Sequence, residues 1–531
     1  MSALWLPALV SLFLTTAFEW QLKPRPQPLW RRPLASLLVH FGTWGLQYAL
    51  WAALVQRPWF AMVIMGSLQM VVIQVSNIKS VSLREPFLCQ DFEYFVDAIR
   101  HPRLYIPFFG IGLTIVASLA GAAAIVAGFM LEPSLLSRLD ASHVWLVLTA
   151  LAVFSLSALS IGLSRLPTCS LEPNEDLVQL GLYPFLWAYG LLARQPLLAD
   201  ASPAVFTRRL EPAQFAQERL PHVVAVQSES FFDPRRWHTN INRDVLSTYD
   251  RLGDEALCRG YLQVPAWGAN TVRTECAFLT GLTPEALGVH RFNPYHQLSR
   301  RALPNLAGQL RSLGYHTICI HPYPANFYRR DKVFPRLGFE TFIDIEAFPQ
   351  ESRDGQYTGD MAIAEKVEHY LAQADDRPLF IFVISMENHG PLHLEQADPA
   401  VAQHWYRQPP PPDYNDLTVY LRHLHNADRM LDCLSHALAD AERPGLLCWY
   451  GDHVPIMPNI YAQLGEPDGL TDYLLWSTQP SAAERPTPSL TSSADALGTT
   501  LLDALIRMAG PPALADELAT FTPPAMNEDY P

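Results

Sequence analysis

Long and short apolar runs divide the chain into two parts. Within the first 165 residues, five stretches approach the ~20 apolar residues with which a helix crosses a bilayer. A single run of this kind would suit a buried helix or a signal peptide, but five in succession predict a membrane domain of five helices over residues 1–165. The predicted spans are Ala3–Phe18, Leu34–Val55, Trp59–Val75, Tyr105–Met130 and Val144–Leu163.

A sixth apolar run, Leu177–Ala193, carries Tyr183, Trp187 and Tyr189. Aromatic side chains of this kind favour the boundary between membrane and water. We therefore expect an interfacial helix within a linker over residues 166–215, with a sixth span as the alternative. Basic residues follow the first and third runs, and the positive-inside rule places both loops in the cytoplasm. With five spans that rule also places the following domain in the cytoplasm, and with six it places the domain outside.

Beyond residue 216 the pattern changes to short apolar strands that alternate with amphipathic helices. Continuous apolar runs indicate strands buried on both faces, and their alternation with helices predicts an α/β domain with a mainly parallel sheet over residues 216–531. The expected strands are His222–Gln227, Thr317–Ile320, Leu379–Ser385 and Leu446–Tyr450. The expected helices are Leu303–Leu313, Met361–Gln373, Leu417–Ala439 and Ala494–Met508. The expected loops are Pro409–Pro412 and Thr478–Pro488.

Charge follows the same division. The 531 residues carry a formal net charge of −14, and charged residues make up 17%, below the ~25% usual for soluble proteins. Residues 1–200 are nearly neutral at +1, whereas residues 201–531 reach −15. This acidity argues against nucleic acid as a partner, because phosphates require a basic surface. None of the seven cysteines forms a C-x-x-C pair, so neither a zinc finger nor a redox motif is predicted.

Chemically active side chains follow all four predicted strands. Glu229 follows the first strand, and Asp452 with His453 follows the fourth. His321 and His389 follow the second and third. Ligand sites in open α/β sheets lie beyond the carboxyl ends of the strands, so we expect these groups at one edge of the sheet. Carboxylates with imidazoles suit a divalent metal such as zinc or manganese, although any one of these residues alone is more simply explained as incidental.

Thr271 is the candidate nucleophile. It follows Gly268, which permits close backbone approach, and precedes the apolar run Cys276–Leu279. It could therefore begin a helix whose N-terminus favours an anion. By itself the segment favours a plain threonine N-cap. Beside a metal the nucleophile becomes the stronger interpretation, because a bound metal lowers the pKa of a hydroxyl group.

Taken in order, these motifs resemble the lipoteichoic acid synthase and phosphoglycerol transferase family, a branch of the sulfatase and alkaline phosphatase superfamily. The resemblance covers roughly residues 221–460 closely and extends more loosely to the apolar spans. It is carried by the segments Asn77–Pro86, Gln227–Phe231 (QSESF), Gly268–Gly281, Phe327–Arg330, Phe334–Phe339, Ser385–Pro391 (SMENHGP) and Tyr450–His453 (YGDH).

The resemblance implies a sulfatase-like, alkaline phosphatase-like fold and a single divalent metal, manganese or zinc. It implies Glu229, Thr271, Asp452 and His453 as the metal ligands, and Thr271 also as the covalent nucleophile. Asn270 stands where many relatives have glycine. We expect this difference to be tolerated, because asparagine enters left-handed backbone conformations more readily than most residues.

The resemblance also implies residues around the substrate head group. His321 and His389 are expected to be catalytic, and Arg330 and Tyr328 to bind the substrate. Without the family motif, Arg330 would be expected in a surface salt bridge. Tyr328 stands where the lipoteichoic acid synthases have tryptophan, a difference at the expected head-group position.

The implied protein lies in the bacterial inner membrane, with five spans, an inside N-terminus and its large domain in the periplasm or extracellular space. The expected reaction moves phosphoglycerol from phosphatidylglycerol, or a related anionic phospholipid, through a threonine intermediate to a sugar or glycerol hydroxyl of an envelope glycan or lipid. The alternatives are a phosphoethanolamine transferase, a sulfatase-like phosphodiesterase and a non-catalytic membrane sensor. The C/S-x-P-x-R motif of sulfatases is absent at Thr271, and the retained Thr271, Asp452 and His453 argue against a sensor.

Overall fold

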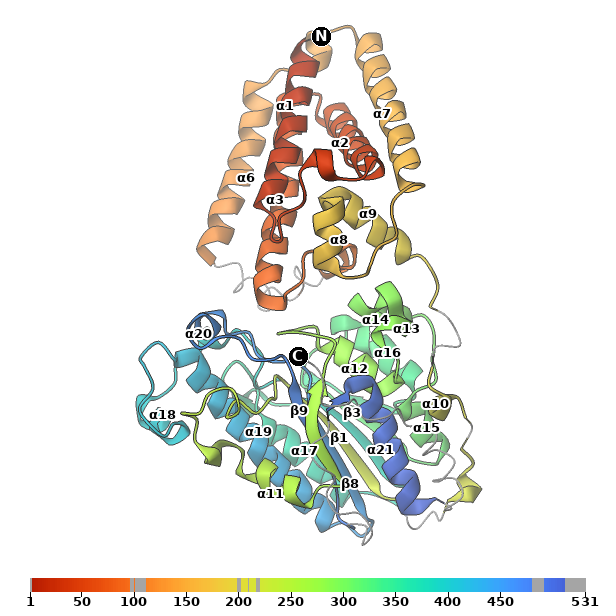
Figure 1. The fold of residues 1–531 in the computed structure, drawn as a ribbon, viewed down its shortest axis with the longest axis vertical. Helices are drawn as coiled ribbons and strands as arrows, with labels where there is room; N and C mark the ends of the chain where they lie inside the picture. Colours follow the sequence, from red (N-terminus) through yellow and green to blue (C-terminus); the bar gives the residue numbers. More distant parts are fainter. Residues whose placement is uncertain are drawn as a thin grey trace. The chain divides into compact units, whose positions relative to one another are not determined.

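The chain folds into two units, Met1–Pro196, which is helical, and Leu197–Pro531, which contains the sheet (Figure 1). The computed structural model describes residues 2–95, 100, 111–197, 202–208, 210–215, 220–479 and 491–510. The described part of the first unit has five long helices, which are α1 (Ser2–Phe18), α2 (Leu34–Val55), α3 (Pro58–Leu83), α6 (Ile111–Leu131) and α7 (Ala141–Leu163).

Within the described residues, four helical stretches are long and apolar enough to cross a membrane. The remaining predicted span, Leu34–Val55, is a 22-residue helix as expected, but polar residues such as His40 and Gln47 lower its hydropathy. Residues 105–110 of the predicted span Tyr105–Met130 lie outside the described residues. A domain of five crossings over residues 1–165 therefore stays a prediction. The four stretches are Ala3–Gln21, Pro58–Leu83, Ile115–Ser137 and Ala141–Leu163.

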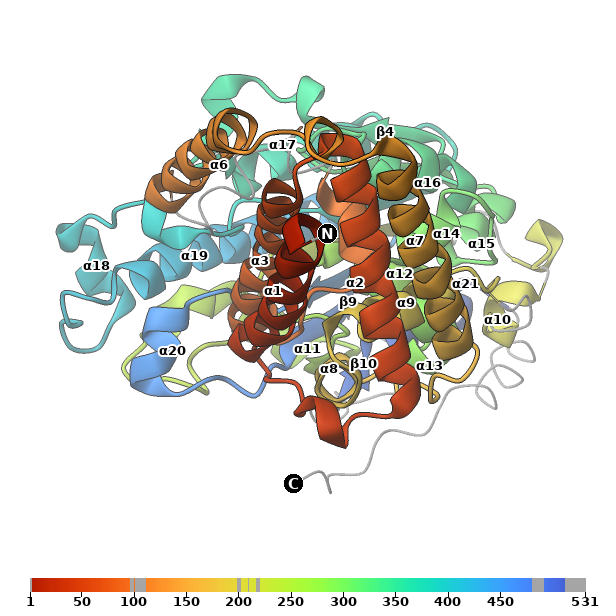
Figure 2. The ribbon, with the colours of Figure 1, turned by 90° about the horizontal axis from the view of Figure 1, so that it is seen from above.

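Helix α2 packs along α7 at close range, and α3 packs against α1 (Figure 2). Glycines make the first approach possible. A Cβ atom on Gly42 would lie 2.7 Å from the backbone of Leu159, and one on Gly162 would lie 2.8 Å from the carbonyl of Ala35. Small residues at helix contacts are typical of membrane proteins, in which close backbone packing stabilises helix pairs.

The outer surface of the first unit is apolar. Phe13 is 71% exposed, Met130 80% and Phe154 73%. Beyond residue 161, the exposed large hydrophobic side chains of the described part are few, and they are isolated from one another in sequence. A surface of this kind fits contact with lipid and supports a membrane location for the first unit. The exposed large hydrophobic residues beyond residue 161 in the described part are Tyr261, Leu394 and Val401.

The expected interfacial helix over Leu177–Ala193 is interrupted. Gly181, with φ of 83°, separates α8 (Pro173–Leu180) from α9 (Leu182–Leu192). Eleven residues are too few to cross a bilayer, which needs ~20. The length of α9 therefore favours an interfacial helix over a sixth span.

The second unit contains a mainly parallel eight-stranded sheet, as the sequence predicts, in the order β10-β2-β9-β8-β1-β7-β3-β4. The run β8-β1-β7-β3-β4 is parallel, and β9 pairs antiparallel with β8 and β2. All four expected strands are present within this parallel run. The strands are β1 (His222–Ser228), β2 (Cys258–Gln263), β3 (His316–Ile320), β4 (Thr341–Ile343), β7 (Leu379–Ile384), β8 (Gly445–Gly451), β9 (Thr471–Ser477) and β10 (Ser492–Ser493), with a separate hairpin of β5 (Arg353–Asp354) and β6 (Tyr357–Thr358).

Helices cover both faces of the sheet, so its central strands are buried on both sides (Figure 1). Strand β1 shows the division, because Val223 and Ala225 enter one core while Val224 and Val226 enter the other. The four expected helices are found as α15 (Leu306–Ser312), α17 (Asp360–Ala372), α19 (Asn415–Ala439) and α21 (Ala494–Ala509). The remaining helices are α10 (Ala204–Thr207), α11 (Ser247–Glu255), α12 (Thr271–Thr280), α13 (Pro284–Leu287), α14 (Pro294–Leu298), α16 (Arg330–Leu337), α18 (Pro399–Trp405) and α20 (Pro458–Leu464).

Candidate active site

Three of the predicted metal ligands meet at the carboxyl ends of β1 and β8. The parallel register pairs Ser228 with Gly451, so the next residues, Glu229 and Asp452, leave the sheet side by side. Potential ligand atoms of Glu229, Asp452 and His453 all lie within 4.8 Å of one another. His453 Nε2 is 3.6 Å from Glu229 Oε1 and 3.2 Å from Asp452 Oδ2. All three residues are at most 3% exposed.

Each of these residues keeps one polar atom without a hydrogen-bond partner among the described residues, namely Glu229 Oε2, Asp452 Oδ2 and His453 Nε2. His453 Nδ1 lies 3.2 Å from the carbonyl of Val454, which can only accept, so Nδ1 carries a proton and Nε2 is the ring atom that could bind a metal. Burial, together with the neighbouring Asp452 carboxylate, raises the pKa of Glu229. Unpartnered buried atoms of this kind are rare in proteins. A divalent cation would satisfy all three at once, so these residues fit the predicted metal.

A second group has a similar composition but different contacts. Asp354, Glu387 and His423 also place potential ligand atoms within 4.8 Å of one another. Here, however, His423 Nδ1 lies 2.7 Å from Glu387 Oε1, and Asn426 donates to both Glu387 and Asp354. The facing atoms are thus engaged by protein partners, so the metal is better placed at Glu229, Asp452 and His453.

Thr271 is the first residue of α12, as the sequence predicts for a helix start. The N-cap position belongs to Asn270, whose side chain makes no capping hydrogen bond, so Thr271 is not a plain N-cap. Thr271 is 9% exposed. One turn along the helix, Thr274 Oγ1 donates to the backbone carbonyl of Asp452 at 2.8 Å. That bond fixes the N-terminal turn of α12 against the strand end that carries two of the proposed metal ligands.

Strained backbone positions adjoin the predicted site residues. Among the described residues of the second unit, the non-glycine residues with positive φ are Ser230 beside Glu229, Asn270 beside Thr271, and Tyr328 and Arg329 before Arg330. Asn270 has φ of 67° and ψ of 41°, which confirms the expected left-handed conformation. Such conformations cost of the order of 1–3 kcal/mol each and cluster at functional sites. Their position beside the predicted site residues supports a functional site in this part of the fold.

Arg330 is a buried residue and not a surface one. It is 1% exposed, and its guanidinium pairs with both carboxylate oxygens of Glu275. Tyr295 donates to the same carboxylate at 2.6 Å. Arg330 Nη1 has no hydrogen-bond partner among the described residues. A buried arginine held on one side with one amino group unpaired is suited to bind an anion.

In both His321 and His389, Nδ1 faces a backbone carbonyl. His321 Nδ1 lies 3.0 Å from the carbonyl of Ile384, and His389 Nδ1 lies 2.7 Å from that of Gly390. Both Nδ1 atoms must therefore donate, and in the neutral ring each Nε2 is left as an acceptor. Burial lowers the pKa of both rings, and the Arg330 charge adds to this effect. Both histidines are thus neutral acceptors near pH 7, able to take a proton.

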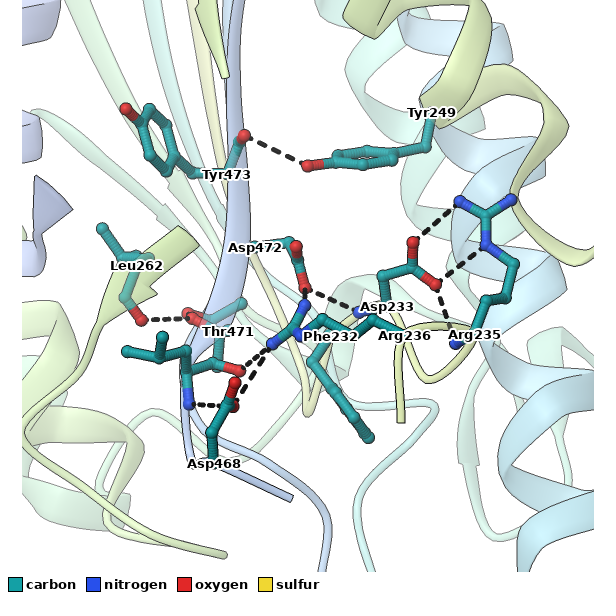
Figure 3. A network of polar contacts seen from close by, with 12 residues as sticks. Phe232, Asp233, Arg235, Arg236, Tyr249, Leu262, Asp468, Thr471, Asp472 and Tyr473 are labelled. Carbon is teal, nitrogen blue, oxygen red and sulfur yellow. Dashed lines mark hydrogen bonds and ion pairs between the residues drawn. The ribbon is translucent and has the colours of Figure 1, made fainter. Parts of the chain in front are cut away.

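Polar contacts also hold the segment that carries Glu229. The backbone N–H of Glu229 donates to Ser385 Oγ at 2.9 Å, and that of Ser230 donates to Asp452 Oδ1 at 2.9 Å. Further along, Asp472 on β9 accepts from the backbone of Asp233 and pairs with Arg236 (Figure 3). These bonds fix the chain at Glu229 and in the residues that follow it, and the bond from Ser230 brings it close to Asp452.

The predicted residues thus lie at the carboxyl ends of β1, β3, β7 and β8 and at the first turns of α12 and α16. The structure brings three of the predicted metal ligands together, whereas metal binding by any of these residues and head-group binding by Tyr328 stay predictions. Sequence reasoning missed several residues that hold the site. Glu275, Ser385 and Asn388 had a signal, because they lie within the motifs Gly268–Gly281 and Ser385–Pro391, whereas Asp360 had none that separates it from other polar residues. Asp360 Oδ1 and the side-chain amide of Asn388 are also buried without partners in the described part of the chain.

Comparisons with known proteins identify the family and agree with the fold. The family model described as Sulfatase matches residues 221–506, more than half of the chain. The capsular polysaccharide biosynthesis protein RkpI of Rhizobium meliloti (strain 1021) is 29% identical over 451 residues, which cover 81% of this chain and 79% of that protein. A putative cyclic beta-1,2-glucan modification protein of the same organism is 27% identical over 295 residues, 55% of this chain and 44% of that protein.

A solved structure shows the same architecture. The integral membrane lipooligosaccharide phosphoethanolamine transferase A (EptA) from Neisseria meningitidis aligns with a TM-score of 0.52 over 88% of this chain and 94% of its own. The sequence identity is 14%. At that identity the likeness concerns the fold, a set of membrane helices followed by an α/β domain.

Proposed function

The chain belongs to the sulfatase family, and from this premise we propose that it is a membrane-anchored, metal-dependent phosphotransferase that moves phosphoglycerol from phosphatidylglycerol to a hydroxyl acceptor. The observation that carries the proposal is the meeting of Glu229, Asp452 and His453, each with an unpartnered atom, beside the helix that begins at Thr271. Acidic and imidazole ligands next to a hydroxyl nucleophile suit phosphoryl transfer better than a binding role.

Glu229, Asp452 and His453 would hold the metal, with Thr271 proposed as the fourth ligand. The donor set of carboxylates, one imidazole and one hydroxyl suits manganese or zinc and does not choose between them. When bound, such an ion lowers the pKa of an adjacent hydroxyl and neutralises charge on phosphate oxygens.

Thr271 is the proposed nucleophile. Its hydroxyl gives up its proton to a neighbouring base as Oγ attacks the phosphorus of the lipid head group, a new P–O bond forms, and the bond to the diacylglycerol oxygen breaks. Diacylglycerol takes up a proton and leaves, and phosphoglycerol stays esterified to Thr271. An acceptor hydroxyl then attacks the same phosphorus, loses its proton, and restores the Thr271 hydroxyl. The position of Thr271 at the first turn of α12 supports this role, since a helix N-terminus favours the phosphate anion.

Arg330, His321 and His389 are proposed to serve the phosphate and the protons. The unpaired Nη1 of Arg330 would bind a phosphate oxygen, and Glu275 would keep the guanidinium in place. The free Nε2 atoms of His321 and His389 would accept protons from attacking hydroxyls and return them to leaving oxygens. Tyr328, whose ring lies 5.3 Å from the Arg330 guanidinium carbon, would border the head group.

Envelope glycans are the proposed acceptors, and the names of the two Rhizobium meliloti relatives, which concern capsular polysaccharide and cyclic glucan, support this choice. We place the protein in the bacterial inner membrane with the second unit in the periplasm or extracellular space. The resemblance supports that side, against the loop charges. A phosphoethanolamine transferase is the second candidate, because the Neisseria meningitidis transferase has the same fold.

The direct test is lipid turnover by the purified full-length chain in detergent, with manganese or zinc. Release of diacylglycerol from phosphatidylglycerol, and none from phosphatidylethanolamine, would support the proposal. Release from phosphatidylethanolamine alone would establish the second candidate, and release from neither lipid would contradict both.

A further inference from the structure

His423 lies at the centre of a buried cluster that the proposed chemistry does not use. It is on α19, is 0% exposed, and has a carboxylate on each side of its ring. Nδ1 lies 2.7 Å from Glu387 Oε1, and Nε2 lies 3.1 Å from Glu395 Oε2. A neutral imidazole donates only one proton, so it could satisfy only one of these carboxylates. The two contacts together therefore favour an imidazolium.

The charges around the ring support the same conclusion. Asp354 on β5 and Asp360 on α17 add two further carboxyl groups to Glu387 and Glu395. One cationic side chain lies at the same edge of the ring as Glu395, because Arg422 Nη2 is 3.1 Å from His423 Nε2 and 2.5 Å from Glu395 Oε2. Arg422 is the group that would favour a neutral ring, but two carboxylates in direct contact with the ring outweigh one partly exposed guanidinium.

Glu387 connects this cluster to the active site. Its Oε1 atom accepts from His423 and, at 2.6 Å, from Asn426, while its Oε2 atom accepts from the backbone of Asp360 at 2.7 Å. In the sequence, Glu387 lies between Ser385 and His389. Ser385 Oγ accepts a hydrogen bond from the backbone of Glu229. The segment of residues 385–389 is thus held at its middle by α19 and contacts the candidate site at both ends.

We propose that His423 is a positioning residue, an internal cation that fixes Glu387 and thereby holds His389 and the Glu229 backbone in place for phosphoryl transfer. It occupies the position among carboxylates that a metal ion would otherwise take. This explains why the Asp354, Glu387 and His423 group resembles a metal site in composition while its facing atoms are already engaged. The role in transfer rests on the proposed function, whereas the charge on His423 does not.

A positive charge on His423 predicts the direction in which stability changes with pH. The flanking carboxylates raise the pKa of His423 from its ordinary value of 6.5 to about 9, against the effect of burial. A raised histidine pKa contributes stability that is complete below the unfolded pKa and is lost as pH rises through the folded one. The thermal midpoint of the wild-type chain should therefore fall as pH rises from about 6.5 to about 9, and His423→Gln should make that fall shallower.

The experiment compares full-length wild type, His423→Gln and His436→Gln in detergent. His436 is the matched control, because it lies on the same helix with a largely exposed side chain. Thermal unfolding is followed against pH, and diacylglycerol release gives kcat and KM. We expect His423→Gln to show a shallower fall in midpoint with rising pH and a loss of about 10- to 100-fold in kcat, with KM little changed, while His436→Gln matches the wild type.

Three outcomes would overturn the proposal. If the thermal midpoint of His423→Gln depends on pH as that of the wild type does, His423 is not an internal cation. If the pH dependence of the midpoint changes but kcat stays at the wild-type value, His423 is not a positioning residue. Should His423→Gln fail to fold, Glu395→Gln removes one of the two flanking carboxylates and should move the alkaline fall to lower pH. An unmoved fall in Glu395→Gln also overturns the proposal. If no variant or wild type turns over lipid, the proposed function fails, but the unfolding data still test the cation.

Discussion

Glu275 holds Arg330 through both of its carboxylate oxygens, in a pair that is almost completely buried. Glu275 lies one turn after Thr271 on α12, and Arg330 begins α16. The pair therefore connects the proposed nucleophile helix to the proposed phosphate ligand. A buried ion pair of this kind is weak support for stability but fixes geometry well, because its partners cannot rearrange without exposing a charge to an apolar surrounding.

Replacing Arg330 by lysine should impair catalysis more than stability. A lysine keeps the positive charge, but its single ammonium group cannot replace the three guanidinium nitrogens, two of which bind Glu275 while the third would bind phosphate. We expect kcat/KM for diacylglycerol release to fall about 100-fold, the size of effect seen when a charge-stabilising donor is removed. Arg251→Lys is the matched control, since Arg251 forms a half-exposed pair with Asp432. Equal activity in the two variants would remove Arg330 from the site.

Metal binding should stabilise the second unit and should depend on Asp452. Without a cation, burial and Asp452 raise the pKa of Glu229 above its ordinary value, so the apo protein loses stability as pH rises above about 4.5. Manganese or zinc at about 100 times its dissociation constant should restore about 2.7 kcal/mol. Thermal unfolding near neutral pH, with and without a chelator, measures this difference. Asp452→Asn should abolish the metal response, and an unchanged response there would place the metal elsewhere.

Acid should destabilise the chain through His321. Burial and the Arg330 charge hold the pKa of His321 well below its ordinary value, so the folded ring stays neutral while the unfolded ring takes up a proton below about pH 6.5. The free energy of unfolding should then fall by up to about 1.4 kcal/mol per pH unit from this group. His321→Gln should show a shallower acid dependence in thermal unfolding. The same acid dependence in variant and wild type would mean that His321 is charged in the folded state.

His389 should matter for turnover and little for folding. Its Nδ1 atom is engaged with the Gly390 carbonyl, which leaves Nε2 as the proposed proton acceptor. His389→Gln removes a basic nitrogen but keeps a polar side chain of similar size, so we expect kcat to fall about 100-fold with an unchanged thermal midpoint. His393→Gln is the control, because this exposed histidine lies four residues later, in a short 3-10 helix. A normal kcat in His389→Gln would show that another group carries the proton.

The sequence predicts local elements well where one pattern dominates. The apolar run of β7 and the amphipathic run of α19 are both found close to their expected bounds. Strand β2 is missed because Cys258–Gln263 alternates buried and exposed residues and pairs antiparallel near the edge, so it has no continuous apolar run. In the first unit the break at Gly181 divides a run that reads as continuous.

The site is predicted where motif and topology agree, and missed where contacts are distant. Glu229 and Asp452 could be paired in advance because parallel strands end at one edge. The partner of Arg330 lies 55 residues away, and that of Glu387 lies 36 residues away, and no local pattern selects either one. The positive φ angles of Tyr328 and Arg329 were equally hidden, since neither residue type favours that conformation.

The most direct measurement of the central claim is peptide mass spectrometry of the full-length chain after incubation with phosphatidylglycerol and manganese or zinc. The account predicts a phosphoglycerol adduct on the peptide that contains Thr271, together with diacylglycerol release, and neither in Thr271→Ala. An adduct on another residue, or release of diacylglycerol by Thr271→Ala at the wild-type rate, would contradict it.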